Sequence, residues 1–464
     1  GSIDLRGYGE TAWSNQVVMV DGLRLSEGDQ SAPLLGGISI DTIERIEVLR
    51  GASSVIYGAG ATAGAILITT KAGAGVARKN SGSITAGLGN KNQRELAVNA
   101  TFATGGFSMD VGAQKRKSDN HRQNFASDSE NLAIAAQWTN EWLRVGANLG
   151  QDDKSSRLPG SLTPAQFAQD PWQANELNDW ASQRVNQHGV FAQAQLGNWE
   201  LAADAGWRDK ASRSIGFYGG AIGYPYDFDI EARNTNLRAR HQVKTDALSN
   251  ALTLGYDQGQ WARTTLGASG NTVKAKNHGF YIKNDLSLTA TATQFNAGLR
   301  TEKTERFSPG SPAFAQRVNA WEFGVAQPIS QEWTAFGRAA KGLRVANVDE
   351  FTFTPGYSLQ AQTSKDLEAG LRWATAANRL EVRAYRSRVT NEIGYDPQAT
   401  PGPFGGRNIN FDPITRSGLE LDSRSSLSEQ LNLNVNAAVR KARFSQGAYA
   451  GNAVPLVARS NLSI

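Results

Sequence analysis

The 464-residue sequence contains no cysteine, which excludes disulfide bonds and thiolate metal sites. No stretch approaches the roughly 18 consecutive apolar residues that a membrane-crossing helix needs. The four histidines have no metal-site spacing, and no H-E-x-x-H or G-x-S-x-G motif occurs. The net charge of +5 is small and its basic residues are scattered, so no nucleic-acid partner is indicated. We therefore expect no enzyme, no bound cofactor and no metal held by protein ligands.

What the sequence does contain is a repeated alternation of apolar and polar residues. In Trp199–Arg208, the two tryptophans, a leucine and two alanines fall on one face, and charged residues fall on the other. Thr291–Glu302 and Leu431–Arg440 alternate in the same way. Such a period of two predicts β-strands with one apolar and one polar face.

The connections between these strands alternate in length. Tight turns are expected around Thr139-Asn140, Gly197-Asn198, Ser330-Gln331 and Ala376-Ala377. The long connections are predicted at residues 152–182, 214–230, 257–277, 343–363 and 393–413. A soluble β-sandwich would also show alternation, but its strands are shorter, at about five or six residues. Short turns at one rim and long loops at the other predict a transmembrane antiparallel β-barrel, with about 18 strands in this chain.

Residues 1–76 do not follow this pattern of hairpins. Val17–Leu25 predicts two strands joined by an Asp-Gly turn. Ile43–Leu49 and Ala65–Thr70 predict two more strands, and Ala52–Tyr57 predicts a helical turn between them. Glycines here permit tight backbone turns. Since wide barrels are filled by plugs, we expect an N-terminal α+β plug domain (1–76) inside a barrel formed by residues 77–464.

Three plug segments resemble the plug signature of the TonB-dependent outer-membrane receptors, a family of siderophore-receptor-like transporters. They are Asp41–Gly51 (DTIERIEVLRG), Val55–Gly60 (VIYGAG) and Gly64–Lys71 (GAILITTK). In the barrel, Thr363–Leu371 (TSKDLEAGL) and Asn408–Glu420 (NINFDPITRSGLE) resemble motifs of the same family. Gly342–Phe351 (GLRVANVDEF) also resembles a family motif, but Val345-Ala346 stands where Ala-Pro is common.

The resemblance implies a barrel of 22 strands in full, so that C-terminal strands would be missing here. It also implies import driven by TonB with ExbB and ExbD, through a TonB box that would precede Gly1. The chain starts with Gly-Ser and shows no signal peptide, which we interpret as a processed or truncated terminus, or as a cloning remnant. The implied location is the bacterial outer membrane, among its lipids and lipopolysaccharide, as a monomer.

Candidate substrate-binding residues lie in an aromatic, glycine-rich loop and in the plug. The loop supplies Phe217, Tyr218, Tyr224 and Tyr226. One interpretation is a lid that stacks on the ligand, and the other is an aromatic girdle at the membrane interface. In the plug, the resemblance to siderophore receptors implies ligand contacts near the predicted turns, for which the candidates are Arg6, Tyr8, Trp13 and Arg24. The alternative for each of these is packing inside the plug.

A plug–barrel contact is predicted at Arg50. Glu368 and Glu420 lie on the polar faces of their strands, so both should point into the lumen. The matching family positions form an arginine–glutamate cluster between plug and wall. We therefore expect Arg50 to pair with Glu368 or Glu420, with an internal pair to Glu47 as the alternative.

The sequence thus indicates a receptor for active import of a scarce metal chelate, with a ferric siderophore as the expected cargo. Cobalamin, haem or another metal complex remains an alternative cargo. Two further alternatives are a passive porin-like channel, which the plug argues against, and a surface signalling receptor.

Overall fold

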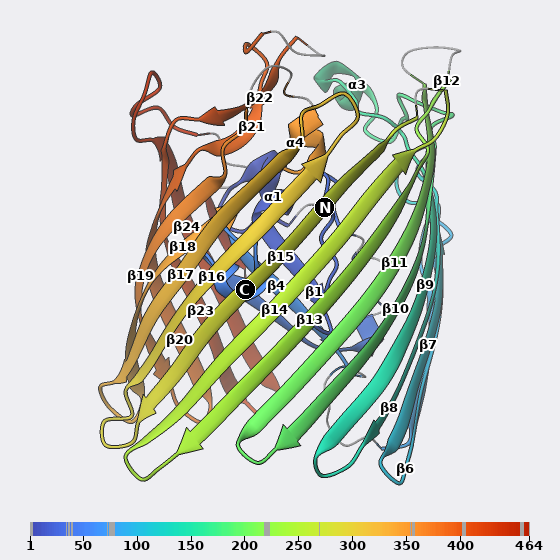
Figure 1. Cartoon of the computed structure of the whole chain (residues 1–464). Helices are drawn as coiled ribbons and strands as arrows, with labels where there is room; N and C mark the ends of the chain where they lie inside the picture. The colour runs from blue at the N-terminus through green and yellow to red at the C-terminus, as the bar shows by residue number, and fades with distance from the viewer. Residues whose placement is uncertain are drawn as a thin grey trace.

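The computed structural model describes residues 3–33, 35, 38, 40–71, 73, 79–217, 223–268, 270–352, 354, 358–400, 405–454 and 459–463. Within these residues, no helix is both long and apolar enough to span a membrane. The chain forms a large antiparallel barrel with a small mixed domain inside it (Figure 1). Both parts of the predicted fold class are therefore confirmed.

The plug is built on a four-stranded sheet in the order β2-β1-β4-β3. Its elements are η1 (Gly9–Thr11), α1 (Ala12–Asn15), β1 (Gln16–Val20), β2 (Leu23–Arg24), η3 (Ile40–Thr42), β3 (Ile43–Arg50), α2 (Ser54–Tyr57) and β4 (Gly64–Thr70). β1 and β4 are parallel, and the other pairs are antiparallel. Val18, Leu25, Ile66 and Ile68 form one of its buried apolar clusters.

The barrel strands follow one another around the sheet in chain order. They are β5 (Ser81–Leu88), β6 (Arg94–Thr104), β7 (Phe107–Ser118), β8 (Ser127–Thr139), β9 (Leu143–Arg157), β10 (Trp180–Leu196), β11 (Trp199–Phe217), β12 (Gly223–Pro225), β13 (Phe228–Lys244), β14 (Leu248–Thr265), β15 (Thr272–Leu288), β16 (Gln294–Phe307), β17 (Phe314–Pro328), β18 (Trp333–Arg344), β19 (Gln362–Ala374), β20 (Asn378–Thr390), β23 (Ile414–Ser428), β24 (Leu431–Phe444) and β25 (Ser460–Ser463). Apart from the three-residue β12, the strands of the described part match the predicted eighteen.

The barrel wall alternates as expected from its sequence. Leu367 in β19 is 63% exposed on the outer surface, whereas its neighbour Glu368 is 8% exposed and faces the plug. Apolar side chains therefore cover the surface that faces lipid, and polar side chains line the lumen. The strand limits place the first barrel residue at Ser81. The division of domains at residues 76 and 77 stays a prediction, since residues 74–78 lie outside the described part.

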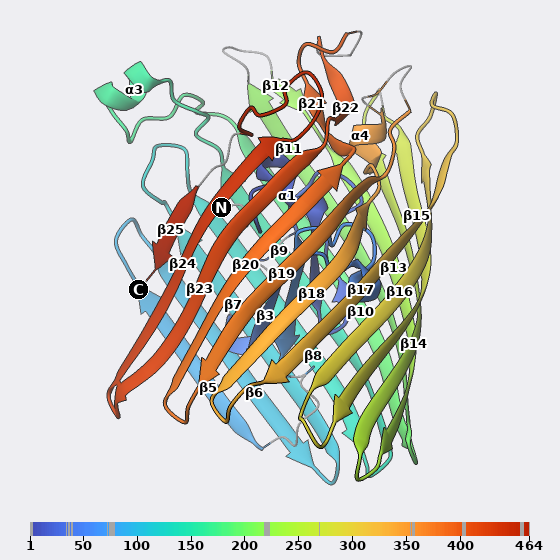
Figure 2. The ribbon, with the colours of Figure 1, turned by 90° about the vertical axis from the view of Figure 1, so that its left-hand side faces the viewer.

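The long connections share one rim and the short turns share the other (Figures 1 and 2). The long-connection rim carries α3 (Pro164–Gln169), α4 (Val348–Thr352), and the hairpin of β21 (Glu392–Asp396) with β22 (Arg407–Phe411). That this rim faces the cell exterior stays a prediction.

Two details of the prediction were wrong. Residues 257–277 are not a long connection, because the ladder between β14 and β15 continues from Gln258 opposite His278 to Thr264 opposite Thr272. His278 is consequently a strand residue. The alternation of the sequence also predicts residues 407–427 as one of the eighteen strands, but the structure divides them into β22 and β23, with an interruption at Asp412-Pro413. Proline has no N–H to donate to the ladder, which explains the break.

Candidate functional site between the plug and the barrel wall

The segment from Arg50 to Ala52 brings the plug backbone against the wall. Gly51 has φ +84°, and a Cβ there would overlap with Oε1 of Glu368. The next residue, Ala52, donates its backbone N–H to Oδ2 of Asp366 at 2.8 Å. Small residues are required here because the wall carboxylates contact the plug backbone itself. This explains the small residues that follow strand β3.

Arg6 bridges the two wall glutamates. Its Nη1 lies 2.7 Å from Oε1 of Glu368, and its Nε lies 3.3 Å from Oε1 of Glu420. The guanidinium also stacks over the ring of Tyr385, 4.0 Å from the centroid. All three charged side chains are almost fully buried. Charge-assisted bonds of this kind are stronger than neutral ones, so Arg6 is a principal attachment of the plug.

Arg50 contacts the same cluster from the other side. Its Nη1 lies 2.8 Å from Oδ2 of Asp422 and 3.6 Å from Oε2 of Glu420. Its hydrogen bonds go to Asp422, whereas Glu368 and Glu420 accept hydrogen bonds from Arg6. Arg45 pairs instead with Glu47, at an exposed position. The sequence analysis missed Asp422, although it lies two residues after Glu420 and therefore on the same strand face.

The other candidate plug residues lie in protein contacts. Tyr8 is buried under Arg416, whose guanidinium lies 4.2 Å from the ring centroid. Arg24 donates from Nη2 to the carbonyl of Ala59 at 2.8 Å. Trp13 packs at the edge of the plug core. A ligand-binding role for Arg6, Tyr8, Trp13 and Arg24 stays a prediction, and the side chains of Arg6, Tyr8 and Arg24 already contact plug or wall.

The aromatic loop lies at the rim of long connections (Figure 1). Tyr224 and Tyr226 are 56% and 49% exposed, and Tyr226 packs on Phe228 at 5.3 Å between ring centroids. Phe217 ends β11 and donates its N–H to Oδ1 of Asp179 at 2.7 Å. Tyr218 lies outside the described residues. Two exposed aromatic rings at this rim are compatible with ligand stacking, so the lid interpretation remains open.

A second attachment, which the sequence analysis missed, is formed by Glu27, Gly28 and Asp29; we call these three residues the acidic hook. Oε2 of Glu27 accepts from Nη2 of Arg208 at 2.8 Å and from the indole Nε1 of Trp261 at 3.1 Å. Both acidic side chains have no exposed surface. A Cβ on Gly28 would lie 2.8 Å from the indole, so only glycine fits between the two acids.

Asp29 connects the acidic hook to the long β18–β19 connection, which carries α4. Nη1 of Arg263 lies 2.8 Å from Oδ2 of Asp29, and Nη2 lies 2.6 Å from Oδ1 of Asp349 in α4. Burial, together with the carboxylates of Glu27 and Asp349, raises the pKa of Asp29, and the charge of Arg263 opposes that shift. A buried carboxylate is costly without its partner, so the acidic hook depends on Arg263 to stay in place.

A third attachment holds the plug segment around α2. Arg300 in β16 forms ion pairs with Asp257 and Glu302, at 2.6 and 2.8 Å. The backbone N–H of Ala59 donates to Oε2 of Glu302 at 3.1 Å. Across the described part of the chain, no three His, Asp or Glu side chains are grouped so as to hold a metal ion. The described interface combines ion pairs and hydrogen bonds with apolar contacts, such as the buried cluster that Val55 of the plug forms with Val318 and Leu343 of the wall.

Family comparisons agree with this architecture. The family model described as "TonB dependent receptor-like, beta-barrel" matches residues 77–464, and the "TonB-dependent Receptor Plug Domain" model matches residues 1–65. The chain therefore belongs to the TonB-dependent receptors, which are outer-membrane β-barrel proteins of bacteria and not enzymes.

Individual relatives differ in what they carry. The vitamin B12 transporter BtuB of Vibrio vulnificus (strain YJ016) is 24% identical over 444 residues, or 91% of this chain. The alignment covers 66% of that relative, so the chain spans less than two thirds of its length. Among solved structures, the ferric citrate transporter FecA matches with a TM-score of 0.83 at 15% identity, covering 100% of this chain and 77% of FecA. The ferric yersiniabactin uptake receptor FyuA of Yersinia pestis matches with a TM-score of 0.77 at 14% identity, covering 97% and 73%. These structural matches show the fold.

Proposed function

We propose that this protein imports a scarce metal chelate across the outer membrane, with a ferric siderophore as cargo and TonB, ExbB and ExbD as the energy source. The observation that carries the proposal is the plug held in the lumen by ion pairs such as Arg6 with Glu368. Water can replace charge-assisted bonds one at a time, so a plug held this way can be displaced by a pulling force. A passive channel needs no such plug.

Ligand capture is assigned to the rim of long connections. Tyr224 and Tyr226 offer exposed aromatic rings there, and Trp13 lies in α1 at the upper end of the plug (Figure 2). Chelates present flat aromatic or carbonyl-rich surfaces on which tyrosine rings can stack, at about 1 kcal/mol for each ring. The receptor is proposed to work as a monomer among outer-membrane lipids and lipopolysaccharide.

Cobalamin is the second candidate cargo. It is favoured by the sequence relatives, which include the vitamin B12 transporters BtuB of Vibrio vulnificus and of Photobacterium profundum.

Uptake by cells tests the proposal. The gene that encodes the chain would be deleted and restored, with tonB present or absent. Radioactive iron would be supplied as catecholate, hydroxamate and citrate chelates, and radioactive cyanocobalamin would be supplied separately. We expect uptake of a ferric chelate that requires both the gene and tonB. Uptake of cyanocobalamin alone would select the second candidate, and uptake that needs no tonB would contradict active import.

The same assay tests the aromatic rim. The double substitution Tyr224→Ala with Tyr226→Ala should weaken binding of the chelate to intact cells by roughly tenfold or more, the equivalent of about 1 kcal/mol for each ring. Tyr449→Ala is the matched control, since Tyr449 is also exposed and lies in another outer connection. Equal binding by the double variant and the control would favour the girdle interpretation.

A further inference from the structure

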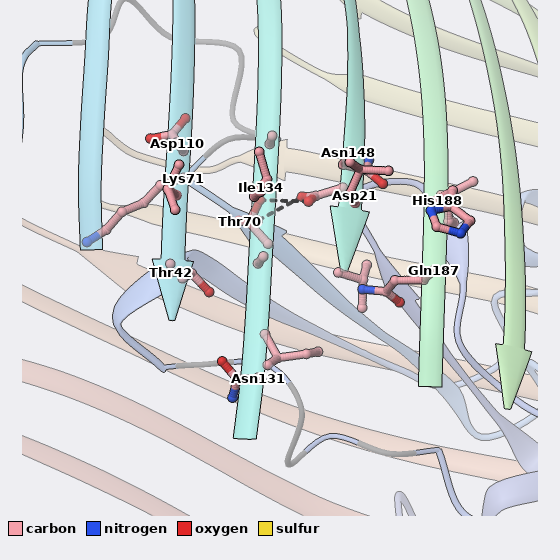
Figure 3. Close-up of a pocket in the computed structure, with 18 of the residues that line it drawn as sticks. Asp21, Thr42, Thr70, Lys71, Asp110, Asn131, Ile134, Asn148, Gln187 and His188 are labelled. Carbon is pink, nitrogen blue, oxygen red and sulfur yellow. Dashed lines mark hydrogen bonds between the residues drawn. The ribbon is translucent and has the colours of Figure 1, made fainter. Parts of the chain in front are cut away.

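One side of the plug faces a hollow space. A cavity of about 390 Å³ lies between the plug and strands β5 to β13 (Figure 3). On the plug side it is lined by Asp21, Thr42, Thr70 and Lys71. The carboxylate of Asp21 accepts from the backbone N–H of Thr70 at 2.7 Å and from its hydroxyl at 2.6 Å, which fixes the β1–β2 turn against the cavity. The volume falls in the range of about 300–1,000 Å³ that is typical of ligand pockets.

The cavity continues toward the rim of short turns. A second space of about 290 Å³ shares Asp21, Asp110 and Asn148 with the first. It is also lined by Gln137 and Arg144, which lie close to the turn that joins β8 to β9. The two spaces together therefore follow the inner wall from the middle of the barrel to its lower rim.

The acidic hook lies beside the upper end of the cavity, next to Leu25 and Arg208. Arg208 lines the cavity and donates from Nη1 to the carbonyl of Leu25 at 3.0 Å, as well as to Glu27. The ion pairs of Arg6 and Arg50, and the hydrogen bond from Ala59 to Glu302, attach the plug to β16, β19 and β23, away from the cavity. Release of the acidic hook would thus connect the outer rim with the hollow side while the plug stays attached elsewhere.

The lining of the cavity indicates what it accepts. Apolar side chains such as Ile134, Leu149 and Trp207 line part of the wall, and amides are the commonest polar side chains there, namely Asn99, Asn131, Asn148, Gln187 and Asn234. An amide both donates and accepts hydrogen bonds, so it can replace the hydration of hydroxyl, carbonyl and carboxylate groups alike. The charged side chains Asp21, Arg24, Lys71, Asp110 and Arg208 carry both signs, so no strong preference for one charge arises.

We propose that this hollow side is the inner half of the translocation passage, that the acidic hook is its outer gate, and that it conducts polar, oxygen-rich solutes. This proposal rests on the proposed function, because a translocation passage has a role only in a protein that imports a solute. The position of the passage, however, is tested without any cargo. Charge removal at the gate should open it, and a bulky side chain in the cavity should close it again.

The experiment measures the conductance of potassium chloride through the purified full-length gene product in planar lipid bilayers. Glu27→Gln combined with Asp29→Asn removes the charges that Arg208 and Arg263 hold, and should raise conductance several-fold over the wild type. Arg208→Gln breaks the same gate from the wall side and should act likewise, so the result does not depend on one variant. Heat-modified gel migration checks that each barrel is folded.

Two tryptophan variants then locate the open passage. Ala133→Trp, added to the opened variant, places a large ring in the cavity and should return conductance toward the wild-type value. Leu132→Trp is the matched control in the same strand, since Leu132 is 42% exposed on the outer face. Equal conductance with Ala133→Trp and Leu132→Trp would show that the passage lies elsewhere. Wild-type conductance in both the Glu27/Asp29 variant and the Arg208 variant would show that the acidic hook is not a gate. The conductance of these variants does not depend on whether cells take up a chelate. The passage and the proposed import function can therefore be refuted independently of each other.

Discussion

Single arginines carry much of the contact between plug and wall. Arg6 satisfies two glutamates that stand on strands separated by one neighbour, β19 and β23. Without it, the two buried carboxylates would keep only the longer contacts of Arg50 with Glu420, at 3.6 Å, and of Arg383 with Glu368, at 3.8 Å. A planar guanidinium reaches both at once, whereas an ammonium acts as a point charge.

We therefore predict that Arg6→Met lowers the free energy of plug unfolding by about 3–5 kcal/mol, the cost of leaving a buried ion pair broken. Arg6→Lys should retain only part of the lost free energy of unfolding. Arg6→Met combined with Glu368→Gln and Glu420→Gln should be more stable than Arg6→Met alone. Urea titration of the purified protein, followed by protease cleavage of the plug, measures the effect.

Lys115→Met is the matched control, because Lys115 forms an exposed ion pair with Glu130. Solvent screens exposed pairs, so the change should be far smaller than for Arg6. Arg6→Met with wild-type resistance to urea would show that the cluster does not hold the plug.

At the scale of elements, the long connections are held by specific contacts. The β9–β10 connection, which carries α3, rests against the β7–β8 connection. The side-chain amide of Asn124 donates to the carbonyls of Leu158 and Glu176, both at 3.0 Å. Arg122 donates from Nε to the carbonyl of Gln173 at 3.0 Å. These bonds give an outer connection of about 20 residues a defined shape, although most such loops have none.

Asn124→Ala should free this connection. We expect added protease to cleave residues 158–179 faster on intact cells, with no change in the amount of folded barrel. Asn92→Ala serves as control, since Asn92 lies in the β5–β6 connection and contacts Asp119 of the β7–β8 connection, away from residues 158–179. If the two variants are cleaved at the same rate, the Asn124 contacts do not order the β9–β10 connection.

For the whole molecule, orientation follows from strand parity. Each hairpin reverses the chain, so all long connections share one rim once one of them is placed. The absence of cysteine provides a clean background for labelling. Asp170→Cys, in the β9–β10 connection, should react with a membrane-impermeant maleimide on intact cells. Asn198→Cys, in the short β10–β11 turn, should react only after the outer membrane is opened. The reverse labelling pattern would show that the barrel has the opposite orientation in the membrane.

Alternation and turn residues alone determined the barrel, the approximate number of strands and the alternation of short and long connections, except at residues 257–277. These features are local, because the side-chain period of a strand is two and a turn needs only a few residues. The lumenal position of Glu368 and Glu420 was predictable for the same reason. Leu367 and Leu419 beside them had to face lipid, and both are exposed on the outer surface.

Only the tertiary structure decided which partner each lumenal charge finds. Arg6 and Glu420 are 414 residues apart, and Arg208 lies 181 residues from Glu27. Many arginines and carboxylates point into the lumen, so strand periodicity cannot choose among them. Which charges form pairs depends on the depth and the rotation of the plug within the barrel. That seating is set by close backbone contacts, such as Gly51 against Glu368 and Gly28 against Trp261, which exist only once the barrel surrounds the plug.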